Sequence, residues 1–466
     1  MAEPRWVQHA VWWHVYPLGF AGAEKAALPA GAPTEHRLQK LIPWLDYVLE
    51  LGASGLALGP VFASETHGYD TTDYFRIDPR LGDDSDFDDL VREAHARGIR
   101  VLLDGVFNHT GRSFQPFQDA LAQGPSAATA PWFRISWPGQ DTGRDEDPGS
   151  TPEQGEPDYE DFEGHHHLVA LNHDEPQVAE FVAGVMKHWL GRGADGWRLD
   201  AAYAVPSSFW STVLASVRAD YPDAYIVGEY IHGDYSAEVS GGTLDSATQY
   251  ELWKAVWSSL NDANFYELSS ALERHNSFLY TFVPLTFVGN HDVTRIASQL
   301  KDPELLPHAL VILFTVGGTP SIYYGDEQAY RGVKEDREGG DDDVRPAFPA
   351  APSDLADFGQ HVYQLHQQLI GVRRRNAWLH TARTSVLSLS NEHLVYQSTG
   401  EGGTKGEGGT EAEEPALVVA LNQAAQPAEL EVPPSASVLL EGNGRLLEGN
   451  RLALPARGWA ILSRQA

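Results

Sequence analysis

The chain has 466 residues, of which 42% are hydrophobic and 11% aromatic, and its net charge is −32 because 65 acidic residues outnumber 33 Lys and Arg. This length and apolar fraction predict a folded globular protein, and the negative charge argues against nucleic acid or an anionic membrane as a partner. The sequence contains no cysteine, which excludes disulfides, thiolate metal sites and cysteine nucleophiles.

Two segments bear on localisation. Residues 1–17, MAEPRWVQHAVWWHVYP, lack the basic start, apolar stretch and small-residue cleavage site of a signal peptide, so we expect a cytoplasmic protein. The longest apolar run, residues 309–318, is far shorter than the roughly 20 residues that a membrane helix needs. We therefore expect no membrane span.

Short apolar runs alternate with helical patterns along most of the chain. The segment at residues 83–98 has apolar residues at helical spacing, acidic residues at its start and Gly98 at its end, which predicts an amphipathic helix. Eight runs are predicted strands: Val11–Pro17, Gly55–Gly59, Arg100–Phe107, Gly196–Ala201, Tyr225–Glu229, Ser246–Tyr250, Leu285–Gly289 and Ser321–Tyr324. Eight strands with intervening helices predict a (β/α)8 TIM barrel, whose active site lies at the carboxyl ends of the strands.

Two segments interrupt this alternation. Residues 110–170 are rich in Pro, Gly, Asp and Glu and too long for an ordinary loop, which predicts an inserted subdomain after the third strand. From residue 376, alternating stretches such as HLVYQ and ALVVALN predict a C-terminal antiparallel β-sandwich. The expected division is therefore a barrel made of residues 1–109 and 171–375, a subdomain at 110–170 and a β-sandwich domain at 376–466.

Four polar clusters follow predicted strands: DGVFNH at 104–109, DGWRLD at 195–200, VGEY at 227–230 and VGNHD at 288–292. Any one of them alone is better explained as a helix cap or a solvated loop. Together they place Asp200, Glu229 and Asp292 at one edge of the barrel, and cleavage of a glycosidic bond needs a carboxylic acid and a second carboxylate. Arg198, two residues before Asp200 on the same strand face, favours the ionised form there. This predicts Asp200 as nucleophile and Glu229 as acid.

The ordered set HGYDTTDYF, DGVFNH, DGWRLD, GE and NHD resembles the α-amylase family of retaining glycoside hydrolases. The segments VWWHVYP, LVALN and GGTPSIYYGDE also resemble that family's pattern, so the similarity spans the chain. The resemblance implies Asp200 as nucleophile, Glu229 as general acid/base and Asp292 as the carboxylate that holds the sugar. It also implies a set of sugar-binding residues, with Tyr69 stacking on the ring: His67, Tyr69, His109, Arg198 and His291.

A finer resemblance is to the cyclomaltodextrinase and neopullulanase branch, seen in FNHTGRSFQPFQDALAQG and DDDVR. It implies that Asp341 and Arg345 contact the next sugar, whereas a surface ion pair is the competing interpretation. After Asp200 the chain reads AAYA, where many amylases that act on long starch have a Lys-His pair. That difference favours short or unusual oligosaccharides, and the sequence leaves the oligomeric state open.

We expect no metal or cofactor. Calcium occurs in the wider family, where Asn108 would be a ligand, and the acidic insert offers oxygen atoms of the kind that calcium binds. However, the insert has no regular ligand spacing, and Ala204 occupies a position where many calcium-binding relatives have a histidine. The run His165–His167 is better explained as a solvated loop, because adjacent residues of an extended chain point to opposite faces.

The sequence therefore predicts a hydrolase of α-1,4-glucosidic bonds in malto-oligosaccharides, cyclodextrins or related α-glucans, with α-1,6 bonds as a further candidate. A transferase or isomerase that uses the same glycosyl-enzyme intermediate is the nearest alternative. A non-catalytic glucan-binding module on the same barrel is a minor one.

Overall fold

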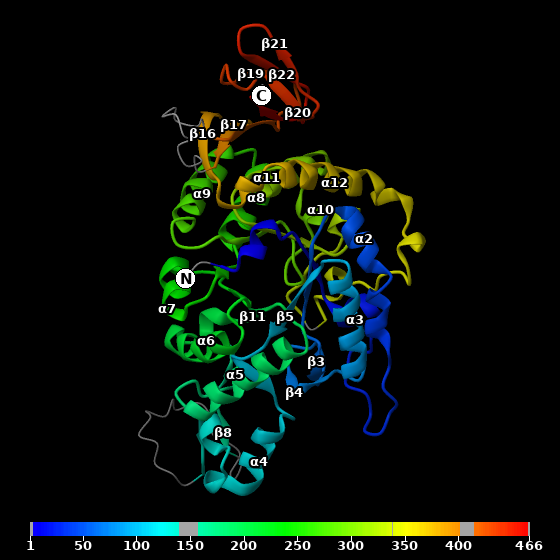
Figure 1. The fold of residues 1–466 in the computed structure, drawn as a ribbon, viewed down its shortest axis with the longest axis vertical. Coiled ribbons are helices and arrows are strands. Elements are labelled where there is room, and N and C mark those ends of the chain that lie inside the picture. The colour runs from blue at the N-terminus through cyan, green and yellow to red at the C-terminus, as the bar shows by residue number, and fades with distance from the viewer. Residues whose placement is uncertain (1–2, 139–156, 338, 401–413, 465–466) are drawn as a thin grey trace.

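The computed structural model describes residues 3–138, 157–337, 339–400 and 414–464 (Figure 1). Its central feature is a parallel sheet of eight strands in the order β13-β12-β11-β5-β2-β1-β15-β14. An isolated parallel bridge between Thr248 and Leu285 joins the two end strands and closes the barrel. The bounds are β1 Trp12–Val15, β2 Gly55–Leu58, β5 Arg100–Gly105, β11 Gly196–Leu199, β12 Tyr225–Gly228, β13 Ser246–Ala247, β14 Leu285–Phe287 and β15 Thr319–Tyr323. The predicted (β/α)8 barrel is confirmed.

Helices surround this sheet and complete the barrel. The longer ones are α2 Trp44–Leu51, α3 Asp84–Ala96, α5 Pro176–Gly191, α6 Ser207–Asp220, α8 Tyr250–Asn261, α9 Phe265–Phe278, α11 Leu306–Thr315 and α12 Gln360–Arg375. The others are α1 Pro17–Ala21, α10 Ile296–Gln299 and α7 Tyr235–Gly242, which has eight residues, as α2 does. Asp83 and Asp86 form a capping box at the start of α3, and the apolar face of this helix is buried, as the sequence predicts.

The segment between β5 and α5 forms a separate small unit at one end of the molecule (Figure 1). It contains β6 His109–Gly111, α4 Gln115–Gln123, β7 Ile135–Ser136, β8 Asp158–Tyr159, β9 Asp161–Phe162 and β10 His165–Ala170. Strands β6, β10 and β9 form one antiparallel sheet, and β7 pairs with β8. Most of the predicted acidic stretch, residues 139–156, lies outside the described residues. A further hairpin, β3 Phe62–Ser64 with β4 Thr71–Ile77, follows β2.

The C-terminal strands lie at the opposite end of the molecule (Figure 1). One antiparallel sheet contains β16 Arg383–Leu389, β17 His393–Thr399, β18 Ala416–Asn422, β20 Val438–Gly442 and β23 Trp459–Ser463. The other contains β19 Ala428–Glu431, β21 Arg445–Leu447 and β22 Arg451–Leu454. A buried cluster that includes Val418, Leu430 and Leu452 draws side chains from both sheets, so the predicted β-sandwich is confirmed.

The opposite face of the five-stranded sheet packs on the barrel. Leu394, Tyr396, Leu417 and Ile461 belong to the same buried cluster as the barrel helices. The β-sandwich and the barrel thus share a buried core. The predicted domain limits at residues 109, 170 and 375 stay predictions. Within the described residues, no helix has the length and apolar character needed to cross a membrane.

Two glycines give a matched test of barrel packing. A Cβ atom on Gly196, at the start of β11, would lie 2.2 Å from the carbonyl oxygen of Tyr225, whereas one on Gly184, in α5, would meet nothing within 4 Å. We expect Gly196→Ala to lower the free energy of unfolding by about 1–3 kcal/mol because backbone must shift. Gly184→Ala should raise it by about 0.5–1 kcal/mol because alanine favours a helix. Urea unfolding measures both, and equal effects would contradict this account of the β11–β12 contact.

Candidate active site

Polar side chains from neighbouring strands meet at the carboxyl edge of the barrel. Asp104 and Arg198 belong to β5 and β11, and Asp200 directly follows β11. Glu229 follows β12, while Asp292 lies beyond β14. The structure thus brings together the three carboxylates that the sequence predicts as catalytic, and adds Asp104 to them.

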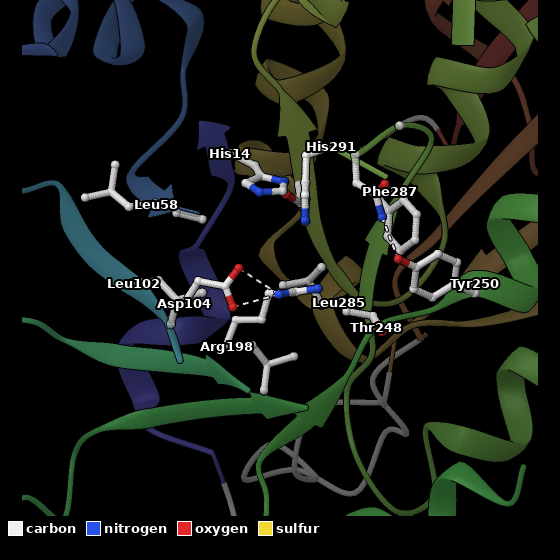
Figure 2. Close-up of a pocket in the computed structure, with 15 residues that line it drawn as sticks. His14, Leu58, Leu102, Asp104, Arg198, Thr248, Tyr250, Leu285, Phe287 and His291 are labelled. Carbon is white, nitrogen blue, oxygen red and sulfur yellow. Dashed lines mark hydrogen bonds and ion pairs between the residues drawn. The ribbon is translucent and has the colours of Figure 1, made fainter. Parts of the chain in front are cut away.

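Arg198 is the centre of this group. Its Nη1 donates to both oxygens of Asp104 at 2.7 Å and to Oδ1 of Asp200 at 3.2 Å, and its Nη2 lies 2.7 Å from Oε1 of Glu229. The side chains of all four residues are 12% exposed or less. One buried guanidinium therefore holds the two proposed reacting carboxylates side by side (Figure 2 shows its contact with Asp104).

Glu229 has further fixed partners. The backbone N–H of Ala201 donates to its Oε2 at 3.0 Å, and the Tyr250 hydroxyl donates to its Oε1 at 3.0 Å. Asn290 donates to the Tyr250 hydroxyl at 2.8 Å. Ala201 has a φ of 45°, a left-handed conformation that is costly for alanine. This strained residue directly follows Asp200 and turns its N–H toward Glu229.

Asp292 lies in a second cluster with His291 and Arg345. Its Oδ2 is 2.8 Å from Nε2 of His291, and its Oδ1 accepts from Nη2 of Arg345 at 2.9 Å. Arg345 also donates to the backbone oxygen of His291 at 3.0 Å and pairs with Asp341 at 3.0 Å. Asp341 and Arg345 are thus an ion pair, but one that reaches the site, because Arg345 is 9% exposed and contacts Asp292.

Tyr69 connects the two clusters. Its hydroxyl donates to Asp104 at 3.1 Å and contacts Nε2 of His291, and its ring is stacked on that of His291 with centroids 5.3 Å apart. The ring of Tyr16 is also parallel to that of His291, at 6.2 Å. Because the Tyr69 hydroxyl touches Nε2 of a nearly parallel ring, the two rings meet at their edges, and the stacking of Tyr69 on a sugar stays a prediction.

The two remaining predicted residues, His67 and His109, contact the backbone of Tyr69. Nε2 of His109 lies 3.0 Å from the backbone oxygen of Tyr69, and its Nδ1 lies 3.1 Å from the side-chain amide of Asn108. His67 accepts from the backbone N–H of Tyr69 at 3.2 Å through its Nδ1. Both ring nitrogens of His109 thus contact protein groups, so its contact with a sugar stays a prediction. His67 is half-buried, and its Nε2 has no hydrogen-bond partner among the described residues.

The charges in the site are unevenly balanced. Burial raises the pKa of Asp200 well above its ordinary value, and the neighbouring Glu229 raises it further. Arg198 lowers the pKa of Asp200, as the sequence predicts, but by less than these two effects. Burial also raises the pKa of Asp292, but His291 and Arg345 outweigh it and hold that pKa well below its ordinary value. The two clusters thus differ, because crowding in the first raises the pKa of Asp200, whereas the cations of the second lower the pKa of Asp292.

The described residues offer little for a calcium ion at Asn108. Its side-chain amide pairs with His109, and its backbone oxygen accepts from Leu171. Among the described residues, one group of acidic and His side chains has the spacing of metal ligands, formed by His36, Asp83 and Asp86. It lies at the start of α3, where the capping box accounts for both carboxylates.

Sequence and structural comparisons identify the family to which this arrangement belongs. A model of the α-amylase catalytic domain matches residues 14–382. The chain belongs to the α-amylase family. A cyclomaltodextrinase of Geobacillus thermopakistaniensis (strain MAS1) is 31% identical over 97% of this chain and 75% of that protein. An intracellular maltogenic amylase of Bacillus subtilis (strain 168) is 32% identical over 71% of this chain and 57% of that protein.

Solved structures agree with this assignment. An acarbose-soaked debranching enzyme of Nostoc punctiforme superimposes with a TM-score of 0.79 and 27% identity, over 99% of this chain and all of that one. The chain is therefore a glycoside hydrolase of the α-amylase family, similar to its cyclomaltodextrinase branch.

Sequence reasoning missed several residues of the site. Asp104 stood in a quoted motif, DGVFNH, but only the structure shows that it binds Arg198 through both oxygens. Its position on the strand beside Arg198 is the signal that could have identified it. Asn290 also stood in a quoted motif, VGNHD, but only the structure shows that it binds the Tyr250 hydroxyl. Tyr250, at the start of α8, gave no such signal.

The pKa of Asp200 leads to a test of stability. Burial raises the pKa of Asp200 in the folded protein above its value in the unfolded chain. The contribution of Asp200 to the free energy of unfolding is therefore greatest below the unfolded pKa and is lost as pH rises through the folded pKa. At pH 7 we expect Asp200→Asn to increase the free energy of unfolding by about 1–3 kcal/mol. Urea unfolding at pH 7 and pH 5 measures this gain, which should shrink at pH 5. Asp220→Asn, at an exposed carboxylate, is the control. A less stable Asp200→Asn protein would contradict the expected crowding.

Proposed function

We propose that this enzyme hydrolyses α-1,4-glucosidic bonds in malto-oligosaccharides, cyclodextrins or related α-glucans by double displacement, with α-1,6 bonds as a second linkage. The observation that carries the proposal is the pairing of Asp200 and Glu229 on one buried guanidinium, with Asp292 and Arg345 beside them. The names of the relatives support this substrate class, and one neighbour is named a debranching enzyme.

In the first step, Glu229 donates a proton to the glycosidic oxygen while the Asp200 carboxylate attacks the anomeric carbon. The bond to the leaving sugar breaks, and a glycosyl ester forms on Asp200. In the second step, Glu229 takes a proton from water, the water oxygen attacks the same carbon, and Asp200 leaves as a carboxylate. The first step needs the ionised form of Asp200, which Arg198 favours and which burial and the charge of Glu229 oppose. A proton on Glu229 removes the second of these opposing effects.

The second cluster would hold the same sugar that Asp200 attacks, as the family resemblance implies. Ionised Asp292, with His291 and Arg345, presents acceptors and donors suited to sugar hydroxyls. The ring of Tyr69 would stack on the sugar, as the resemblance implies. Asp341 and Arg345 would reach the next sugar, because Arg345 contacts both Asp341 and Asp292.

Three further proposals complete the description. Activity requires no metal or cofactor, a proposal that rests on Ala204 at the position where many calcium-binding relatives have a histidine. The enzyme acts in the cytoplasm, as the name of the intracellular Bacillus subtilis relative suggests.

Hydrolysis is favoured over a purely binding role because all the carboxylates are present and positioned. Transfer to a sugar acceptor would use the same intermediate and is separated from hydrolysis by its products.

Removal of either reacting carboxylate should abolish turnover. We expect Asp200→Asn and Glu229→Gln each to lower kcat on maltoheptaose at least about a thousand-fold, because one loses the nucleophile and the other the proton donor. Chromatography of the released glucose and maltose measures this. Asp220→Asn should keep wild-type activity. Full activity in Asp200→Asn would overturn the assignment of the site.

The stereochemistry of the product separates the two roles. The wild-type enzyme should release the α-anomer first, which NMR of the fresh product detects. With azide and an activated α-glucosyl substrate, Glu229→Ala should yield the α-glucosyl azide, because Asp200 still forms the ester. Asp200→Ala should yield the β-azide by direct attack. Exchange of these two outcomes would reverse the assigned roles, and first release of the β-anomer would exclude double displacement.

A further inference from the structure

A cavity of about 40 Å³ lies inside the barrel, and Arg198 and His291 are among the residues that line it (Figure 2). The interior of such a barrel is normally filled by layers of side chains. Here small residues, including Ala57, Gly289 and Ser321, occupy part of the wall. The cavity therefore exists because the sequence places small side chains on β2, on β15 and just after β14.

Several polar groups around this cavity have unused hydrogen-bonding capacity. Neither ring nitrogen of His14, on β1, has a hydrogen-bond partner among the described residues, and the same holds for Oγ of Ser321 and Nε of Arg198. His14 and Ser321 are 9% and 5% exposed. Buried polar groups are nearly always hydrogen-bonded, so three such residues around one cavity indicate a built polar site.

The volume of the cavity suits water. A buried water needs about 10–15 Å³ of such space and makes about three hydrogen bonds to otherwise unpaired polar groups. The cavity has room for about three waters, and its polar groups come from β1, β11 and β15. A larger ligand, such as a sugar ring, has no room there.

We propose that this cavity binds a cluster of water molecules through His14, Ser321 and Nε of Arg198, and that His14 is a positioning residue for the active site. Through these waters, His14 supports Nε of Arg198. The Nη atoms of the same guanidinium hold Asp104, Asp200 and Glu229. His14 also meets the ring of His291 edge-on, with centroids 5.1 Å apart at 85° (Figure 2). It thus packs on His291 of one cluster and would reach Arg198 of the other through water.

The surroundings of His14 keep its ring neutral, as this role requires. Burial lowers its pKa well below the ordinary value, and the charges of His291, Arg198 and Arg345 lower it further, against the opposing effect of Asp292. A neutral imidazole can donate at one nitrogen and accept at the other, so it can order water on both sides. The ring is also tilted against Tyr323, with centroids 5.3 Å apart, which restricts its rotation.

A crystal structure of the wild-type protein at a resolution that shows ordered water tests the binding site. We expect at least two waters in the cavity, with hydrogen bonds to His14 and Ser321. Crystals of Ser321→Val should show fewer, because the added methyl groups occupy the cavity. A wild-type cavity that is dry, or filled by rearranged side chains, would overturn the proposal.

Kinetics test the positioning role, which rests on the proposed function. His14→Leu keeps a similar volume but cannot bind water, whereas His14→Gln keeps polar atoms in the same region. We expect His14→Leu to lower kcat about tenfold with KM changed less than threefold, because Arg198 acts on the reacting carboxylates. His14→Gln should stay within threefold of the wild type.

Thermal unfolding of both variants provides the control for a general loss of structure. Equal kcat losses in His14→Leu and His14→Gln, or a fall in kcat that matches a fall in folded fraction, would contradict the positioning role. If the wild-type enzyme turns over no α-glucan, the proposed function fails, but the crystallographic result still decides whether the water site exists.

Discussion

The site depends on one buried cation and on the strand register that places it. Arg198 on β11 is directly opposite Asp104 on β5, and Nη1 of the arginine bonds both oxygens of that aspartate. A shift of one residue in this pairing would point Arg198 to the outside of the barrel. Removal of Asp104 would leave a buried charge short of its main partner, a loss that is strongly destabilising in proteins. Asp104 therefore fixes the arginine on which Asp200 and Glu229 meet.

The other half of the site is held by aromatic rings. His291 lies parallel to both Tyr69 and Tyr16, and the guanidinium of Arg345 lies over the Tyr16 ring at 4.6 Å. This stack sets the direction of the His291 ring toward Asp292. The two halves differ because ionic contacts of Arg198 fix the first, whereas the second combines the ionic contacts of Asp292 with ring packing. Tyr69 joins them through its hydroxyl, which reaches Asp104.

The sequence was sufficient to predict the barrel, since all eight apolar runs became strands and the face of α3 with Phe87 and Leu90 is buried. Residues placed directly after strands, such as Asp200 and Glu229, could be found because topology alone brings them to one edge. Residues that act through partners distant in sequence could not. The His291–Tyr69 stack joins positions 222 residues apart, and the net pKa of Asp200 depends on burial, which no motif reveals.

The closure of the barrel is uneven. Strand β13 has only two residues, and a single bridge at Thr248 joins it to β14, with support from a bond between the Gln249 N–H and the Leu285 oxygen. Segments with few backbone bonds open at a lower free-energy cost than full ladders. Tyr250, which holds Glu229, directly follows this seam. The hydroxyl that holds Glu229 is thus attached to a part of the barrel wall with few backbone bonds, whereas Asp200 follows a strand that is paired over four residues on each side.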